Sequence, residues 1–238
     1  LGSLKENTFA QINEQEWKLS TDPAEKMAPE FEARLDHLKK ELSKKLRRIK
    51  LPQLLIEVDN QLRFTSQFMS EAQQENPAPE NICELLSTIL AHGCNIGLET
   101  MSHLVEGVSY HRLKQLSDWI LTEEAQRSAL ACVVNGINQL ELAQAWGTGT
   151  SSSSDGQRFA LRSKVLQQTY SSQLNDFAIE FYSWVADNYA PFYSMPIECT
   201  ERDAPYVLDG LLYNESELPL EEHYTDTHGY TEHNFAAF

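Results

Sequence analysis

The sequence predicts a mixed α/β fold in which a helical N-terminal region precedes a region rich in strands. Three observations support this. Apolar residues recur at steps of three and four through much of residues 28–145, the composition changes at Trp146, and aromatic and aliphatic residues then alternate in short runs. With 238 residues and 41% hydrophobic content, the chain can bury a sizeable core. We expect three parts, at 1–80, 81–145 and 146–238.

The composition limits the classes of protein. The four cysteines form no C-x-x-C pair, which favours reduced cytoplasmic thiols over a disulfide framework or a zinc site. No apolar run reaches the roughly 18–20 residues of a membrane span, and we expect no signal peptide, because no basic-then-apolar N-terminal pattern is seen. The first residue is Leu1 and the last residues are apolar, so we expect a piece of a longer protein. The formal net charge of −16 opposes nucleic-acid binding only weakly, because basic surfaces can lie on other domains.

The first element we expect is one long amphipathic helix over residues 28–50, after a polar segment (1–26) with little periodicity. Its apolar stripe consists of Phe31, Leu35, Leu38, Leu42, Leu46 and Ile49. Pro52 is expected to end the pattern. The basic end of the helix, which includes Lys44, Lys45, Arg47 and Arg48, is interpreted as a solvated face that complements the helix dipole. The alternative is a contact between these four residues and a phosphate backbone.

The middle of the chain reads as a helical region. A short strand is expected first, over residues 54–58, where apolar residues alternate, followed by a linker at 71–80. Several helices then fill residues 81–145. The expected breaks are Gly93 and Gly97, and the expected N-caps are Ser109 and Thr122. Core packing is favoured here over a helix-turn-helix DNA reader.

After Trp146 the elements alternate. A small, hydroxylated stretch leads to an extended run that carries Asp155. A hairpin follows over residues 177–200, with its turn at 187–191. A helix is expected over 203–213 with Asp203 as its cap, then a strand at 222–225 that delivers Asp226, and Thr231 caps a further helix. This order matches the first part of a ribonuclease-H-like fold.

Asp155 and Asp226 are the main candidates for catalysis, because each is expected where an extended run ends and a turn begins. Carboxylate oxygens at such places suit a divalent metal. The simpler interpretation of Asp155 is a turn aspartate that bonds its own backbone before Gly156, and Asp209 competes as the second carboxylate. The five-residue spacing of His223, His228 and His233 does not favour zinc, since it keeps to no face of a helix or strand.

Four motifs resemble the Tn3 family of replicative transposases over roughly residues 80–238. In chain order they are residues 90–98 (LAHGCNIGL), 146–159 (WGTGTSSSSDGQRF), 202–212 (RDAPYVLDGLL) and 223–231 (HYTDTHGYT). The resemblance implies a helical region followed by an incomplete ribonuclease-H-like catalytic domain of the DDE type. Such a DNA transposase nicks the transposon's terminal inverted repeats by hydrolysis and joins the 3′-hydroxyls to target DNA.

The resemblance also implies roles for individual residues. Asp155 and Asp226 match the first two catalytic carboxylates, which bind Mg²⁺ in a two-metal site. The third, a downstream glutamate, has no counterpart, so we expect this piece alone to be inactive. Thr148 stands where the family motif has an aspartate. Residues expected close to DNA are Gln157, Arg158, His228, Lys44, Lys45, Arg47 and Arg48, although Arg158 could equally pair with a buried carboxylate.

The implied partners are double-stranded DNA, at the transposon ends and the target, and a second copy of the full-length enzyme. The implied location is the bacterial cytoplasm at the nucleoid, with no membrane. Two alternatives stay open from the sequence. One is a catalytically inactive remnant that binds only DNA or an intact transposase. The other is a helical scaffold with no nucleic-acid role, which the charge of −16 motivates.

Overall fold

A computed structural model describes residues 10–12, 17–19, 29–70, 74, 78–162 and 164–237. The chain forms two compact units, Leu1–Ile49 and Lys50–Phe238, and each is described by itself. Most of the segments expected to be polar (1–26) or a linker (71–80) lie outside the described residues. The exception near the N-terminus is an antiparallel pair of short strands, β1 (Ala10–Ile12) and β2 (Trp17–Leu19).

The long helix of the first unit is shorter than predicted. Helix α1 spans Pro29–Lys45 instead of 28–50. The prediction that Pro52 ends this helix is wrong, because Pro52 lies in the first turn of the next helix, where a missing N–H costs nothing. The apolar stripe also differs from the expectation, since Phe31, Leu38 and Leu42 are exposed.

The second unit begins with a helix where a strand was predicted. Helix α2 spans Leu51–Leu62, so the prediction of a strand at 54–58 is wrong. Apolar residues there alternate, but they also recur at helical spacing. Leu55 and Val58 pack against the buried Phe64 and Leu86, and this packing selects the helical pattern.

The predicted helical region is confirmed in type. Its further elements are η2 (Phe64–Phe68), α4 (Pro79–Gly93), α5 (Leu98–Leu104), α6 (Tyr110–Trp119), α7 (Glu123–Asn138) and α8 (Glu141–Gln144). Gly93 ends α4, and Gly97 takes a positive φ of 84°. Both predicted caps form, because the hydroxyls of Ser109 and Thr122 each accept a backbone N–H at 3.2 Å. None of the described helices combines the length and apolarity needed to cross a membrane.

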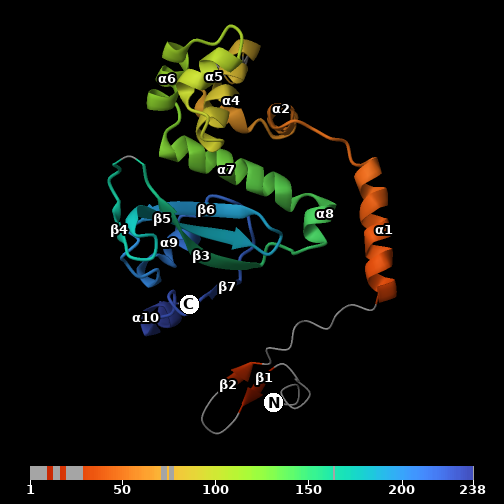
Figure 1. The fold of residues 1–238 in the computed structure, drawn as a ribbon, viewed down its shortest axis with the longest axis vertical. Helices are drawn as coiled ribbons and strands as arrows, with labels where there is room; N and C mark the ends of the chain where they lie inside the picture. The colour runs from red at the N-terminus through yellow and green to blue at the C-terminus, as the bar shows by residue number, and fades with distance from the viewer. Residues whose placement is uncertain are drawn as a thin grey trace. The chain divides into compact units, whose positions relative to one another are not determined.

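A five-stranded mixed sheet forms the last part of the chain. Its strands are β3 (Ser151–Ala160), β4 (Thr169–Ser171), β5 (Asp176–Ala186), β6 (Pro191–Ile197) and β7 (Glu222–Thr225). Strand β5 pairs antiparallel with β3 on one side and with β4 and β6 on the other, and β3 pairs parallel with β7. Figure 1 shows these strands with α7 alongside β6. The hairpin and the strand at 222–225 are therefore confirmed.

The sheet buries a core on the face made by the even-numbered positions of β5. Tyr182 and Trp184 are almost fully buried there and cluster with Val134 of α7. The indole N–H of Trp184 donates to the carbonyl oxygen of Val207 at 3.0 Å, which fixes the segment after β6 against the sheet. Gly210 lies against the same indole ring.

The helix predicted over 203–213 is broken into two short pieces, η3 (Ala204–Tyr206) and α9 (Asp209–Leu212). Asp203 makes no side-chain cap bond and has helical angles (φ −68°, ψ −28°), whereas an N-cap residue is non-helical. The predicted cap is therefore wrong. The final helix, α10 (Glu232–Ala237), does begin after Thr231, whose hydroxyl accepts the N–H of Asn234 at 3.1 Å.

Candidate active site

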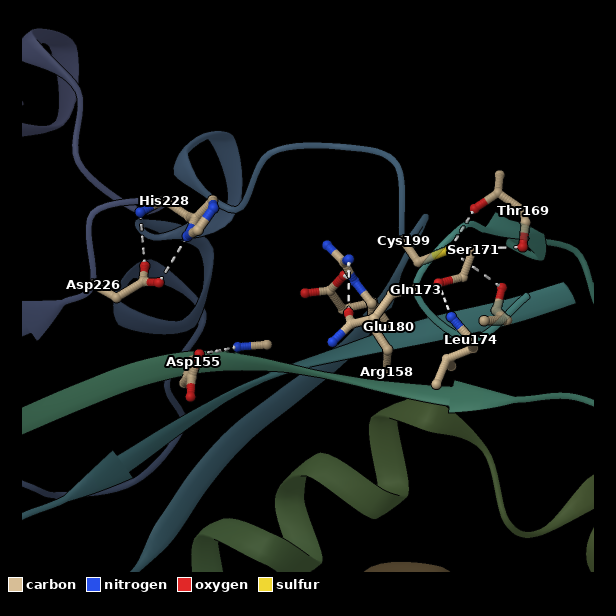
Figure 2. Close-up of polar contacts among 12 residues, drawn as sticks. Asp155, Arg158, Thr169, Ser171, Gln173, Leu174, Glu180, Cys199, Asp226 and His228 are labelled. Carbon is tan, nitrogen blue, oxygen red and sulfur yellow. Dashed lines mark hydrogen bonds and ion pairs between the residues drawn. The ribbon is translucent and has the colours of Figure 1, made fainter. Parts of the chain in front are cut away.

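The parallel pairing of β3 with β7 brings two distant aspartates together. The last paired residues are Ser154 and Thr225, so Asp155 and Asp226 come next on adjacent segments although 226 − 155 = 71 positions separate them. Figure 2 shows Asp155 on its strand and Asp226 in a turn beside His228. Asp226 follows the end of its strand as predicted. Asp155 lies within β3 and not at its end, because β5 continues to pair with β3 as far as Ala160.

The Asp226 carboxylate is held by its own turn. One oxygen accepts the backbone N–H groups of His228 (2.9 Å) and Gly229 (3.1 Å), and the other lies 3.0 Å from Nδ1 of His228. The hydrogen bond from His228 is the main reason why the pKa of Asp226 is lowered. A carboxylate that stays ionised and fixed in direction is suited to bind a cation.

Asp155 is more open. Its Oδ1 accepts the N–H of Gly156 at 2.8 Å, and the side chain is exposed. This is the local backbone bond that the simpler interpretation of the sequence predicted. The second carboxylate oxygen has no hydrogen-bond partner among the described residues. The two aspartates therefore differ, since Asp226 is fixed by three contacts and Asp155 by one.

Buried acidic residues surround the site, and sequence reasoning missed them. Burial raises the pKa of Asp203, and the charges of Glu180 and Asp226 raise it further. Tyr182 has its pKa raised to about 12, mainly by burial and then by Asp203, Asp226 and Asp155. Alternation along β5 could have revealed Glu180, because it stands between Ala178 and Tyr182, both buried.

Glu180 is neutralised by Arg158. The guanidinium Nε lies 2.7 Å from the carboxylate Oε2, and the Glu180 side chain is 4% exposed. Gly156 makes room for this carboxylate, because a Cβ there would collide with Glu180 Oε1. Arg158 lies on the opposite face of β3 from Asp155, since side chains alternate along a strand. Of the two roles that the sequence allowed for Arg158, pairing with a buried carboxylate is therefore confirmed. Its contact with DNA stays a prediction.

The other predicted DNA-proximal residues lie in several places. Gln157 is exposed on the Asp155 face of β3, and His228 is tied to Asp226. The basic residues of the first unit are at the end of α1 (Lys44, Lys45) and just beyond it (Arg47, Arg48), and all four are exposed. Lys44 pairs with Glu41 at 2.6 Å. Asp209, the competing carboxylate, is the first residue of α9, and strand register does not place it beside Asp155.

A half-buried histidine connects the two strands that carry the site. Nδ1 of His223 lies 2.8 Å from the Ser152 hydroxyl, and its Nε2 lies 2.9 Å from the Ser154 hydroxyl. Ser154 continues the chain to the Tyr182 hydroxyl at 2.8 Å. Burial lowers the pKa of His223 to about 4. These serines therefore contribute to strand pairing, and sequence spacing alone gave no sign of that role.

This histidine predicts acid sensitivity. The unfolded chain takes up the proton near the ordinary pKa of 6.5, whereas the folded chain does so only near 4. The contribution of His223 to the free energy of unfolding is therefore constant above pH 6.5. It falls as the pH drops from 6.5 towards 4, with a slope of at most about 1.4 kcal/mol per pH unit. His223→Asn, which does not titrate, should flatten the loss. Urea unfolding of both proteins across this range checks it, and parallel curves would contradict the assignment.

The donor atoms suit a hard divalent cation, but they are few. Carboxylate oxygens are the ligands that Mg²⁺ prefers, and Asp155 and Asp226 supply them on adjacent segments. Among the described residues no group of three or more histidine, cysteine, aspartate or glutamate side chains could hold a metal ion. The pair thus fits as two ligands of a site, and Asp226 Oδ2 would have to exchange its contact with His228 for the metal.

A hollow of about 820 Å³ lies elsewhere, between η2, α4, α6, α7 and β6. Mostly apolar side chains line it, among them Phe64, Phe68 and Leu130. Neither Asp155 nor Asp226 is part of the lining. The candidate site is therefore identified by its two carboxylates and not by the volume of a cavity.

The chain is similar in sequence to known transposases. The family described as Tn3 transposase DDE domain matches residues 53–238. The chain is 41% identical over 192 residues to the transposase for transposon Tn2501 of Escherichia coli, which covers 79% of this chain and 19% of that protein. It is 40% identical over 199 residues to the transposase for transposon Tn501 of Pseudomonas aeruginosa, covering 82% of this chain and 20% of that protein.

A third relative extends the match towards the N-terminus. The transposase for transposon Tn1546 of Enterococcus faecium is 36% identical over 230 residues, which covers 96% of this chain and 23% of that protein. The chain thus spans about a fifth of the length of the curated relatives it matches.

Proposed function

Because the chain belongs to the Tn3 transposase DDE family, we propose that it supplies the first two metal-binding carboxylates of a DNA transposase. The observation that carries this is the register of β3 and β7, which sets Asp155 beside Asp226. Neither residue is near the other in sequence, and a parallel strand pair is a rigid way to fix two oxygens next to each other.

The strand order supports a ribonuclease-H-like fold, which a DDE domain implies. The central strand β3 lies between an antiparallel neighbour, β5, and a parallel neighbour, β7, and β6 completes the hairpin. The sequential hairpin followed by η3, α9 and the crossover to β7 gives the mixed sheet predicted from the element order. Strand β4 is an addition within the β3–β5 connection.

In this function the residues hold and orient the reacting groups. The divalent metal that a DDE domain implies, with Mg²⁺ the proposed ion, activates a water or 3′-hydroxyl and stabilises the leaving oxygen when bound. Asp155 and Asp226 would hold it, and the N–H groups of His228 and Gly229 fix the direction of the Asp226 carboxylate. The contacts of His223 with Ser152 and Ser154 join β7 to β3 just before the two aspartates. A downstream glutamate would complete the set of ligands.

The proposed partners follow from the reaction. The substrates are the double-stranded ends of the transposon and a target duplex, and two copies of the full-length protein would act on the two ends. Gln157 lies on the exposed face of β3 beside Asp155, and the basic residues Lys44, Lys45, Arg47 and Arg48 of the first unit are proposed to contact the DNA backbone.

The test uses this chain extended by the downstream acidic segment and measures Mg²⁺-dependent nicking of a terminal inverted repeat. Asp155→Asn and Asp226→Asn should each lower the rate by about 100-fold or more, since each removes charge aimed at the transition state. Asp176→Asn is the matched control. That residue is exposed and accepts its neighbour's N–H at 2.7 Å, much as Asp155 does at 2.8 Å. Nicking that survives both site substitutions would refute the assignment.

A further inference from the structure

Four aromatic side chains form an exposed surface on the sheet, here called the aromatic platform: Phe159, Tyr170, Phe177 and Phe181. They come from β3, β4 and β5 and are between 39% and 52% exposed. Phe159 and Phe181 meet edge to face with ring centroids 5.8 Å apart, and Tyr170 and Phe177 do so at 6.1 Å. A contiguous exposed apolar surface of this kind can mark a binding site, whereas single exposed rings are common.

The aromatic platform lies on the same face of the sheet as Asp155. Residues opposite each other in an antiparallel pair point the same way, and Gln157 is opposite Phe181 while Tyr170 is opposite Phe177. Asp155, Gln157 and Phe159 alternate onto that face along β3. Phe159 is four residues from Asp155, or about 13 Å along the strand.

Cations gather at the aromatic platform in an otherwise acidic region. Residues 146–238 contain four Lys or Arg residues against fourteen Asp or Glu, and two of the four, Arg162 and Lys164, come shortly after the end of β3. The backbone N–H of Leu161 donates to the Phe177 carbonyl at 2.9 Å, which brings this part of the chain beside the rings. Arg162 and Lys164 are exposed, and neither forms an ion pair with another described residue.

We propose that the aromatic platform stacks the unpaired bases of a DNA strand whose phosphate reaches Asp155 and Asp226. Exposed rings next to exposed cations are the combination that binds single strands, because every base has a stackable face and every nucleotide a phosphate. A duplex hides its base faces, so it cannot use the rings in this way. The proposal rests on the proposed function for its direction, since that function places a reacting phosphate at Asp155.

The experiment measures binding of this chain to labelled oligonucleotides by fluorescence anisotropy, at fixed low salt with a chelator present. The probes are oligothymidine of about 15 nucleotides, a duplex of equal length, and an abasic strand of equal length that keeps the phosphates but has no bases. The chain should bind oligothymidine more tightly than either of the other two. A single strand bound no better than the duplex or the abasic strand would overturn the proposal.

Phe177 provides the matched variants. Phe177→Leu keeps an apolar side chain but no ring, and it should weaken oligothymidine binding about fivefold or more without changing abasic binding. Phe177→Tyr keeps the ring and should bind like the original chain. The control Trp119→Leu removes an exposed ring from α6 and should have no effect. If Phe177→Leu binds oligothymidine normally, the surface serves apolar protein contact or nothing, and the proposal fails.

Two further variants separate this proposal from the proposed function. Arg162→Gln with Lys164→Gln should lower the salt dependence of binding, because fewer phosphates are contacted. Asp155→Asn removes a negative charge close to the bound phosphate, so it should strengthen metal-free binding of the strand while it lowers nicking. A Phe177 effect that persists when the nicking test fails would establish the surface without the activity. Nicking that requires Asp155 while the Phe177 effect is absent would refute only the aromatic platform.

Discussion

Gly210→Ala is expected to lower the free energy of unfolding by about 2–3 kcal/mol, because it overfills a tightly packed contact. A Cβ at position 210 would come within 3.0 Å of ring atoms of Trp184. The ring cannot withdraw, since it is fully buried and its N–H is bonded to Val207, three residues before Gly210. The segment that fixes the indole is therefore the same one that would collide with it in the variant.

The matched control is Gly93→Ala at the end of α4, where a Cβ would meet nothing within 4 Å. That substitution should be neutral or stabilising by up to about 1 kcal/mol, because alanine restricts the unfolded chain more than glycine does. Urea unfolding of the two variants beside the original chain gives the comparison. Equal stabilities for the two variants would show that α9 can move away from Trp184.

Arg158→Leu is expected to destabilise the fold by about 3 kcal/mol, at the low end for a broken buried pair because the Arg158 side chain is itself partly exposed. The loss arises from Glu180, whose carboxylate would stay buried without its cation. Removing both charges with Arg158→Leu and Glu180→Met should restore most of the stability, since a buried ion pair is often no better than apolar packing.

A double-mutant cycle on Arg158 and Glu180 measures this coupling by urea unfolding. The exposed pair of Lys114 and Asp118, at 2.9 Å, is the control, and Lys114→Leu should change stability little. If Arg158→Leu is as mild as Lys114→Leu, then Glu180 finds another partner, and Arg158 becomes available for the DNA contact predicted from the sequence.

Most patterns between residues close in sequence were predicted correctly. The hairpin of β5 and β6 and the strand before Asp226 follow from alternation with a clear turn. The strand predicted at 54–58 failed because alternating apolar residues also satisfied a helical spacing, and contacts with Phe64 decided between the two. Strand β4 has only three residues, too few for an alternation to be visible.

The candidate site, too, was predicted from the sequence only in part. Its two aspartates could be selected from the family motifs, but their adjacency depends on a parallel pairing that no local pattern specifies. The Arg158–Glu180 pair and the contacts of His223 depend on neighbouring strands. Such partners become visible only when the register is known, which is why the sequence left Arg158 with two roles and His223 with a structural or DNA-proximal role whose partners were not named.

The pairing of β7 with β3 also sets an order in time. Strands β5 and β6 are joined by a short turn, whereas β7 meets β3 across about seventy residues, and contacts of such separation form slowly because the loop between them must first be closed. We expect the hairpin to fold during synthesis before β7 leaves the ribosome. A nascent chain at that stage carries Asp155 without Asp226 beside it, so the proposed pair of metal ligands could not form until synthesis has passed Asp226.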